Sequence, residues 1–129
     1  MLHIRPEQMK VLDDHMVRKF EDLMVAHLNK YFPEHCKKLG EDGTRKSVRQ
    51  AIERAGSYGI VFERDVCVYT DVMFEFGRNF DKNPRLPWAS KILNDEVLEG
   101  LPTDKVGQLY DAAVENLEQA RGIEPETEV

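Results

Sequence analysis

The segment between Phe62 and Phe76 constrains the fold more than any other part of the sequence. Apolar side chains recur there at helical spacing and cover most of the circumference of the predicted helix. They are Phe62, Val66, Cys67, Val68, Tyr69, Val72, Met73, Phe74 and Phe76. Polar side chains form one narrow stripe at Arg64, Asp71, Glu75 and Arg78, with spacings of seven, four and three residues. A helix with so narrow a polar face packs on several sides, so residues 62–76 predict a central helix ending at Gly77.

The N-terminal half predicts three further helical segments. The first begins at Pro6, which suits a first helical position, and runs to about Tyr31. A short piece follows over residues 33–39, and the composition of residues 40–43 is typical of a turn. Asp42 or Thr44 can cap the next helix, which ends at Gly56 or Gly59. The residues expected to face the core are Met9, Leu12, Met16, Phe20, Leu23, Leu28, Val48, Ala51, Ile52 and Ala55.

The C-terminal part predicts a stiff loop and two helices. Pro84 and Pro87 stiffen the loop, and Pro87 begins a short helix that runs to Leu93. The last helix is expected to be capped by Thr103 and to end at Gly122. Its inward face is Val106, Leu109, Tyr110, Ala113, Leu117 and Ala120. Its outward face is acidic and consists of Asp104, Asp111, Glu115 and Glu118.

Together these patterns predict an all-α fold, a compact single-domain bundle of about five to six helices around the central apolar helix. Neither an internal repeat nor the period-two pattern of a strand is found. With 129 residues, of which 41% are hydrophobic, the chain can bury a core without disulfides. We expect residues 1–121 to form the helical domain and residues 122–129 to form a flexible acidic tail.

The distribution of charge and cysteine narrows the class of protein. The net charge is −6, and residues 95–129 alone hold ten acidic and two basic residues. The one basic stretch, over residues 37–54, is interrupted by carboxylates, which argues against a nucleic-acid partner. We expect no secretory signal, since the first residues lack an apolar core, and no run of about 20 apolar residues would span a membrane. Cys36 and Cys67 do not form a CxxC pair and are expected to be reduced thiols of a cytoplasmic protein.

No motif for catalysis or metal binding emerges from the spacing of reactive residues. The four histidines lack HxxxH or HExxH spacing, and His15 lies twelve positions from His27. Residues 81–92 fail the calcium-loop template, so Asp81 or Asn83 is expected to cap local backbone instead. Cys67 lies among apolar neighbours, and neither a glycine-rich phosphate loop nor GxSxG occurs. We therefore expect no catalytic residue, no metal ligand and no cofactor, and a protein that is not an enzyme.

Scattered residues over positions 4–93 carry a family resemblance. They are the opening run Ile4-Arg5-Pro6-Glu7-Gln8-Met9, then Tyr58-Gly59-Ile60, Glu63-Arg64-Asp65-Val66, Tyr69, Met73-Phe74, Phe76-Gly77, Phe80-Asp81, Pro84, Pro87-Trp88-Ala89 and Ile92-Leu93. With these residues the chain resembles small helical accessory proteins of bacterial type VI secretion effector clusters. The resemblance implies a co-chaperone that binds the adaptor chaperone of a toxin effector. It also implies displacement of that co-chaperone when the effector is loaded onto the PAAR spike.

Two sets of residues are candidates for contact with such a protein. The acidic face of Asp104, Asp111, Glu115 and Glu118 could speed encounter with a basic surface, although a plain solvated face is the simpler interpretation. Phe80, Leu86 and Trp88 could anchor a partner, although packing of their loop against the central helix is the simpler interpretation. One alternative function is an immunity protein that binds and neutralises the toxin directly. A second is a small-molecule binder or enzyme, which would need a deep pocket with convergent polar groups.

Overall fold

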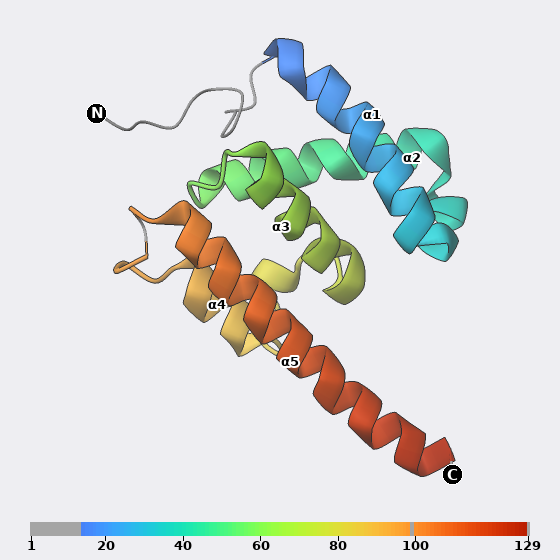
Figure 1. Ribbon diagram of the computed structural model, residues 1–129, viewed down its shortest axis with the longest axis vertical. Helices are drawn as coiled ribbons and strands as arrows, with labels where there is room; N and C mark the ends of the chain where they lie inside the picture. The colour runs from blue at the N-terminus through green and yellow to red at the C-terminus, as the bar shows by residue number, and fades with distance from the viewer. Residues whose placement is uncertain (1–13, 99, 129) are drawn as a thin grey trace.

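The computed structural model describes residues 14–98 and 100–128, and Figure 1 shows their arrangement. Within these residues the chain forms five α-helices, one 3-10 helix and no β-strand. They are α1 (Asp14–Tyr31), α2 (Pro33–Ser57), α3 (Glu63–Phe76), η1 (Phe80–Lys82), α4 (Pro87–Leu93) and α5 (Pro102–Glu128). The predicted all-α bundle is confirmed. The expected helix start at Pro6, together with Met9 and Leu12, lies outside the described residues.

The helix α3 is central, as its sequence predicts. It contacts α1, α2, η1 and α5, and Figure 1 shows it between the α1–α2 pair and the α4–α5 pair. Val66 and Tyr69 are fully buried, and Val72, Met73 and Phe74 are nearly so. The core around them is built from residues of every other helix. These include Phe20, Met24, Leu28, Val48, Ala51, Ala55, Phe80, Ala89, Leu93, Val106, Leu109 and Ala113.

The expected turn at residues 40–43 is a single-residue kink within α2. Gly40 alone leaves the helical conformation, with φ of 75° and ψ of 171°, which glycine adopts without the steric cost of a Cβ atom. Gly43 stays helical, and Thr44 does not cap a new helix. Instead its hydroxyl donates to the Gly40 carbonyl at 2.8 Å. The predicted break is therefore in the right place, but the prediction of a four-residue turn is wrong.

Some helix ends agree with the sequence prediction and others differ from it. Gly59 follows α2 with φ of 81°, and Gly77 ends α3 with φ of 117°, so both glycines occupy conformations that other residues rarely adopt. α5 begins at Pro102, so Thr103 lies within the helix and the predicted cap at Thr103 is wrong. The Thr103 hydroxyl donates to Asp65 of α3 at 2.9 Å. The prediction that the last helix ends at Gly122 is also wrong. The described backbone of α5 is helical to Glu128 and projects past the other helices in Figure 1.

A buried lysine joins the ends of two helices. Lys105 of α5 is only 2% exposed, and its ammonium group donates at 3.0 Å to the carbonyls of Tyr58 and Leu93. Those carbonyls lie at the C-terminal ends of α2 and α4, where the helix dipole attracts positive charge. Lys105 therefore satisfies carbonyls that would otherwise lack helical donors, and it fixes α5 across both helix ends.

Two buried carboxylates pair with arginines of α2. Asp81 of η1 is buried and accepts hydrogen bonds from Arg54 at 3.0 Å and from the Tyr58 hydroxyl at 2.7 Å. Glu21 of α1 is buried and accepts from Arg49 of α2 at 2.6 Å. The predicted local turn is present at Asn83, whose side chain accepts from the Arg85 N–H at 2.9 Å. Much of the basic stretch between residues 37 and 54 is thus engaged with carboxylates of its own chain.

Candidate functional site

The most distinctive surface feature of the described residues is a groove that runs over α3. α1 and α5 flank α3 in Figure 1, and the described parts of their backbones do not contact each other. The groove between them has a volume of about 290 Å³. Its lining comes from all three helices and the residue after α1. It comprises His27, Tyr31, Phe32, Asp71, Val72, Glu75, Phe76, Tyr110, Ala113, Val114 and Leu117.

At about 290 Å³, this groove is smaller than a second pocket of about 380 Å³ that lies between α2 and the end of α3. What distinguishes the groove is its apolar character and its aromatic rim. Tyr31 on α1 is 60% exposed and Tyr110 on α5 is 54% exposed, so two large rings border the groove without being buried. Exposed aromatic and apolar side chains gathered at a concave surface are typical of an interaction site.

The apolar border continues along α1. Leu23 is 63% exposed and lies four residues before His27 and eight before Tyr31. Residues four apart share one side of a helix, so Leu23 extends the same wall by one more turn. The inward position predicted for Leu23 is therefore wrong, and so is that predicted for Tyr110. Both side chains add to the surface beside the groove.

A polar cluster lies where the α1 wall meets the α3 floor. Nε2 of His27 lies 2.8 Å from Oδ1 and 3.1 Å from Oδ2 of Asp71. Cys67 lies one turn before Asp71 on α3, and the donor atoms of these three side chains all lie within 4.8 Å of one another. All three side chains are partly buried, and the His27 ring also packs against Tyr31 with ring centroids 4.8 Å apart.

Burial shifts the pKa of two of the three side chains in this cluster. Burial raises the pKa of the Asp71 carboxyl above its ordinary value, and the hydrogen bond from His27 opposes part of that shift. Burial, together with the nearby carboxylates of Asp71 and Glu63, raises the pKa of the Cys67 thiol to about 11. The thiol is therefore protonated at neutral pH and is a poor nucleophile by itself.

Sequence reasoning missed this cluster. His27 and Asp71 are 44 positions apart, and only packing of α1 on α3 brings them together. The local signal was the spacing of Cys67 and Asp71, which are four apart on one helix and therefore share a face. That spacing is common in helices and does not by itself predict a site.

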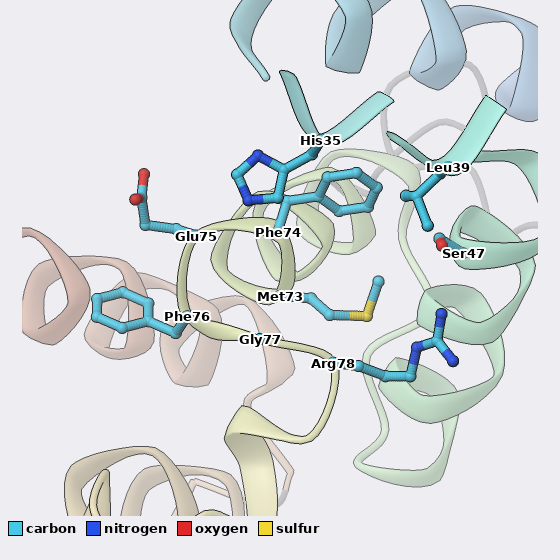
Figure 2. A pocket seen from close by; sticks show the side chains of 9 residues that line it. All are labelled: His35, Leu39, Ser47, Met73, Phe74, Glu75, Phe76, Gly77 and Arg78. Carbon is cyan, nitrogen blue, oxygen red and sulfur yellow. The ribbon is translucent and has the colours of Figure 1, made fainter. Parts of the chain in front are cut away.

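The polar side chains that line the second pocket do not form a cluster. It is lined by His35, Leu39, Ser47, Met73, Phe74, Glu75, Phe76, Gly77 and Arg78. Figure 2 shows the His35 imidazole beside the Phe74 ring, while Glu75 and Arg78 point in opposite directions. Cys36, which neighbours His35 in sequence, is buried and only 4% exposed. The polar side chains around this pocket therefore do not converge on one point, as a substrate site would require.

The residues predicted to contact a partner differ in accessibility. Asp104, Asp111, Glu115 and Glu118 are all exposed on α5, as predicted. Phe80 is fully buried with its ring 5.1 Å from that of Tyr69, so the hypothesis that it anchors a partner is wrong. Leu86 and Trp88 are half-buried, and the Trp88 ring packs edge-on against Phe76 of α3 at 5.1 Å. The loop is thus packed onto the central helix by two of the three candidate anchors.

None of the helices in the described part of the chain is both long and apolar enough to cross a membrane. Comparisons of the chain with models of protein families, with curated proteins and with solved structures give no match. The groove over α3, with its aromatic border and the acidic side chains beside it, is therefore the basis on which a function is inferred.

Proposed function

We propose that the protein is a non-enzymatic co-chaperone of a bacterial type VI secretion effector. It binds the adaptor chaperone of the effector through the groove between α1, α3 and α5. It is displaced when the effector is loaded onto the PAAR spike. The resemblance over residues 4–93 suggests this role, and the single structural observation that carries it is the apolar groove with two exposed tyrosines on its border.

The shape of the groove suits a helical segment of the adaptor. Two parallel walls, from α1 and α5, stand on either side of a floor formed by α3. Val72 and Phe76 lie one turn apart along that floor, which matches the spacing of apolar side chains on one face of a docked helix. A groove of this size gives a modest interface, and a modest interface is what a partner that must later be displaced requires.

Acidic side chains beside the groove indicate the charge of the segment that binds there. On α5, each of Asp111, Glu115 and Glu118 directly follows a groove-lining residue, namely Tyr110, Val114 and Leu117. A step of one residue turns about 100° around a helix, so the acidic side chains form a stripe along the solvent side of the groove wall. Asp71 and Glu75 add two carboxylates from the floor. We infer that the adaptor presents an amphipathic helix whose apolar face is flanked by lysine or arginine.

The test is capture of partners by the tagged full-length protein from its native bacterium, with mass spectrometry of the proteins that elute. The proposal predicts recovery of an adaptor chaperone that the purified spike protein displaces. The double variant Tyr31→Ala and Tyr110→Ala is expected to weaken capture at least about tenfold, because exposed aromatics dominate interface energetics. The matched control is Val97→Ala, which alters a side chain that is 81% exposed outside the groove and should leave capture unchanged.

An immunity protein is the second candidate, and the exposed acidic stripe of α5 favours it. A row of carboxylates can occupy the basic site of a toxin that acts on nucleic acid. In that case the captured protein is the toxin itself, and expression of the chain protects cells that make the toxin. Recovery of the toxin alone, with such protection, overturns the co-chaperone proposal. Equal capture of the adaptor by the wild type and the tyrosine double variant overturns the assignment of the groove.

A further inference from the structure

The cluster of His27, Cys67 and Asp71 offers three different metal-ligating atoms from two helices. An imidazole nitrogen, a thiol sulfur and a carboxylate oxygen all lie within 4.8 Å of one another. Among the described residues, no other group of three or more histidine, cysteine or acidic side chains converges in this way. The other buried charges already have protein partners, since Asp81 pairs with Arg54, Glu21 with Arg49, and Lys105 with two carbonyls.

The geometry points to a binding site for a divalent transition metal of the zinc class, with His27 Nε2, Cys67 Sγ and an Asp71 carboxylate oxygen as its protein ligands. This mixed set of nitrogen, sulfur and oxygen donors suits Zn²⁺ and disfavours Mg²⁺ and Ca²⁺, which prefer oxygen alone. Three protein ligands leave a fourth tetrahedral position for water. His27 and Asp71 also line the groove, so that fourth position is reached from the groove.

Only small movements are needed to form the site. Zinc bonds of about 2.0–2.3 Å in tetrahedral geometry place neighbouring donor atoms roughly 3.3–3.7 Å apart. His27 Nε2 and Asp71 Oδ1 lie 2.8 Å apart and have to open by about half an ångström, while any donor pair near the 4.8 Å limit of the cluster has to close. The His27 and Asp71 side chains are 28% and 37% exposed, so both can rotate without disturbing the core.

A dication would stabilise the anionic forms of the two acidic ligands, because thiolate and carboxylate would then face a positive charge. Binding releases the thiol proton of Cys67 to water and forms the metal–sulfur bond. The proton on His27 Nε2 moves to Nδ1, so that the neutral ring binds through Nε2.

The site lies at the junction between the α1 wall and the α3 floor of the groove. A bound ion would therefore tie the two helices together and fix the spacing of that wall. This inference does not rest on the proposed co-chaperone role, because the three ligands belong to this chain alone.

The test is a titration of the metal-free full-length protein with Co²⁺, followed by displacement with Zn²⁺. We expect one ion per chain, a thiolate-to-cobalt charge-transfer band in the near ultraviolet, visible bands typical of tetrahedral cobalt, and loss of both on addition of Zn²⁺. Cys67→Ala is expected to abolish the charge-transfer band. His27→Gln and Asp71→Asn are each expected to weaken binding of the ion at least about tenfold.

The control is Cys36→Ala, which removes the other cysteine and should leave every band in place. Circular dichroism of each metal-free variant checks that it folds, and Cys67→Ser replaces Cys67→Ala if the alanine variant does not. Failure to bind Co²⁺ at one equivalent overturns the inference. So does a charge-transfer band that survives in Cys67→Ala, or one that disappears in Cys36→Ala.

Discussion

The imidazole of His27 on α1 donates from Nε2 to the Asp71 carboxylate on α3, with the oxygens at 2.8 and 3.1 Å. The pair connects one wall of the groove to its floor, and its two residues are 44 positions apart in the sequence. It therefore links the α1 side of the groove to the α3 floor. Its strength can be separated from the effect of a bound ion.

A double-mutant cycle on His27→Ala and Asp71→Ala, measured in the presence of a chelator, should give a coupling of about 0.5–1 kcal/mol. Partly exposed hydrogen-bonded pairs fall in this range because water competes for both groups. The free energy of unfolding by urea for the wild type, both single variants and the double variant supplies the coupling. A coupling indistinguishable from zero would show that the hydrogen bond does not stabilise the α1–α3 junction.

Lys105 provides the second prediction. Lys105→Met keeps the length of the side chain but leaves the carbonyls of Tyr58 and Leu93 without their donor. We expect a loss of about 2–4 kcal/mol of unfolding free energy, since each buried acceptor without a partner costs about 1–3 kcal/mol. The control is Lys91→Met at an exposed position of α4, which should change stability by less than about 0.5 kcal/mol. Equal effects of the two substitutions would contradict the assigned role of Lys105.

Local patterns in the sequence predicted the parts of this fold that depend on local physics. The apolar periodicity of residues 62–76 and the proline at position 87 give α3 and α4 almost residue for residue. Thr103 is a suitable capping residue by type, but α5 begins one residue earlier at Pro102, and the Thr103 hydroxyl donates to Asp65, which is 38 positions away. The candidate metal cluster has the same origin. It depends on how α1 packs on α3, and no spacing within either helix encodes that.

The accessibility of individual apolar residues was the weakest part of the sequence prediction. Periodicity places Tyr110 on the inward face of α5, yet the ring is 54% exposed. The described parts of α1 and α5 do not meet over α3, so the side of α5 next to the groove has no helix to cover it. Phe80 is fully buried against Tyr69, as the simpler interpretation of a loop packed onto the central helix predicts.

Stability at alkaline pH is the third prediction. Burial and the hydrogen bond to Asp81 raise the pKa of Tyr58 to about 12, from about 10 in the unfolded chain. The folded state thus keeps a proton that the unfolded state has lost, so stability is full below pH 10 and falls as the pH rises towards 12. Burial raises the pKa of Tyr69 as well, and that residue adds to the decline.

Tyr58→Phe should make this decline less steep, although the variant starts from a lower stability because its hydrogen bond to Asp81 is lost. Urea unfolding at a series of pH values between about 8 and 12 measures the slope. Tyr31→Phe is the control, since that hydroxyl belongs to a side chain that is 60% exposed. The same slope in Tyr58→Phe as in the wild type would contradict the role given to the Tyr58 hydroxyl.

The fourth prediction is that Trp88 contributes to the stability of the fold and not to binding of the adaptor. Its ring meets Phe76 edge-on at 5.1 Å and is half-buried, so Trp88→Ala should cost about 2–3 kcal/mol, somewhat less than for a fully buried tryptophan. Chemical unfolding measures this cost, and adaptor binding is compared under conditions where both proteins remain folded. Full stability combined with lost binding would make Trp88 an interface anchor instead.

The acidic stripe of α5 should affect the association rate constant of the adaptor more than its dissociation rate constant. Reversal of Asp111, Glu115 and Glu118 to lysine removes the attraction between this wall of the groove and a basic segment. We expect the association rate constant to fall about tenfold or more at low salt. The wild-type and variant rates should converge near 1 M salt, where the screening length is only about 3 Å.

Stopped-flow association at several salt concentrations provides the measurement. The matched control reverses three exposed acids outside the groove, Glu34, Glu53 and Glu96, and so changes the net charge by the same amount. If steering is local to the groove, this control keeps most of the wild-type rate because the charges beside the binding surface are intact. If both triple variants slow association equally, net charge alone attracts the adaptor and the stripe on α5 has no special part in docking.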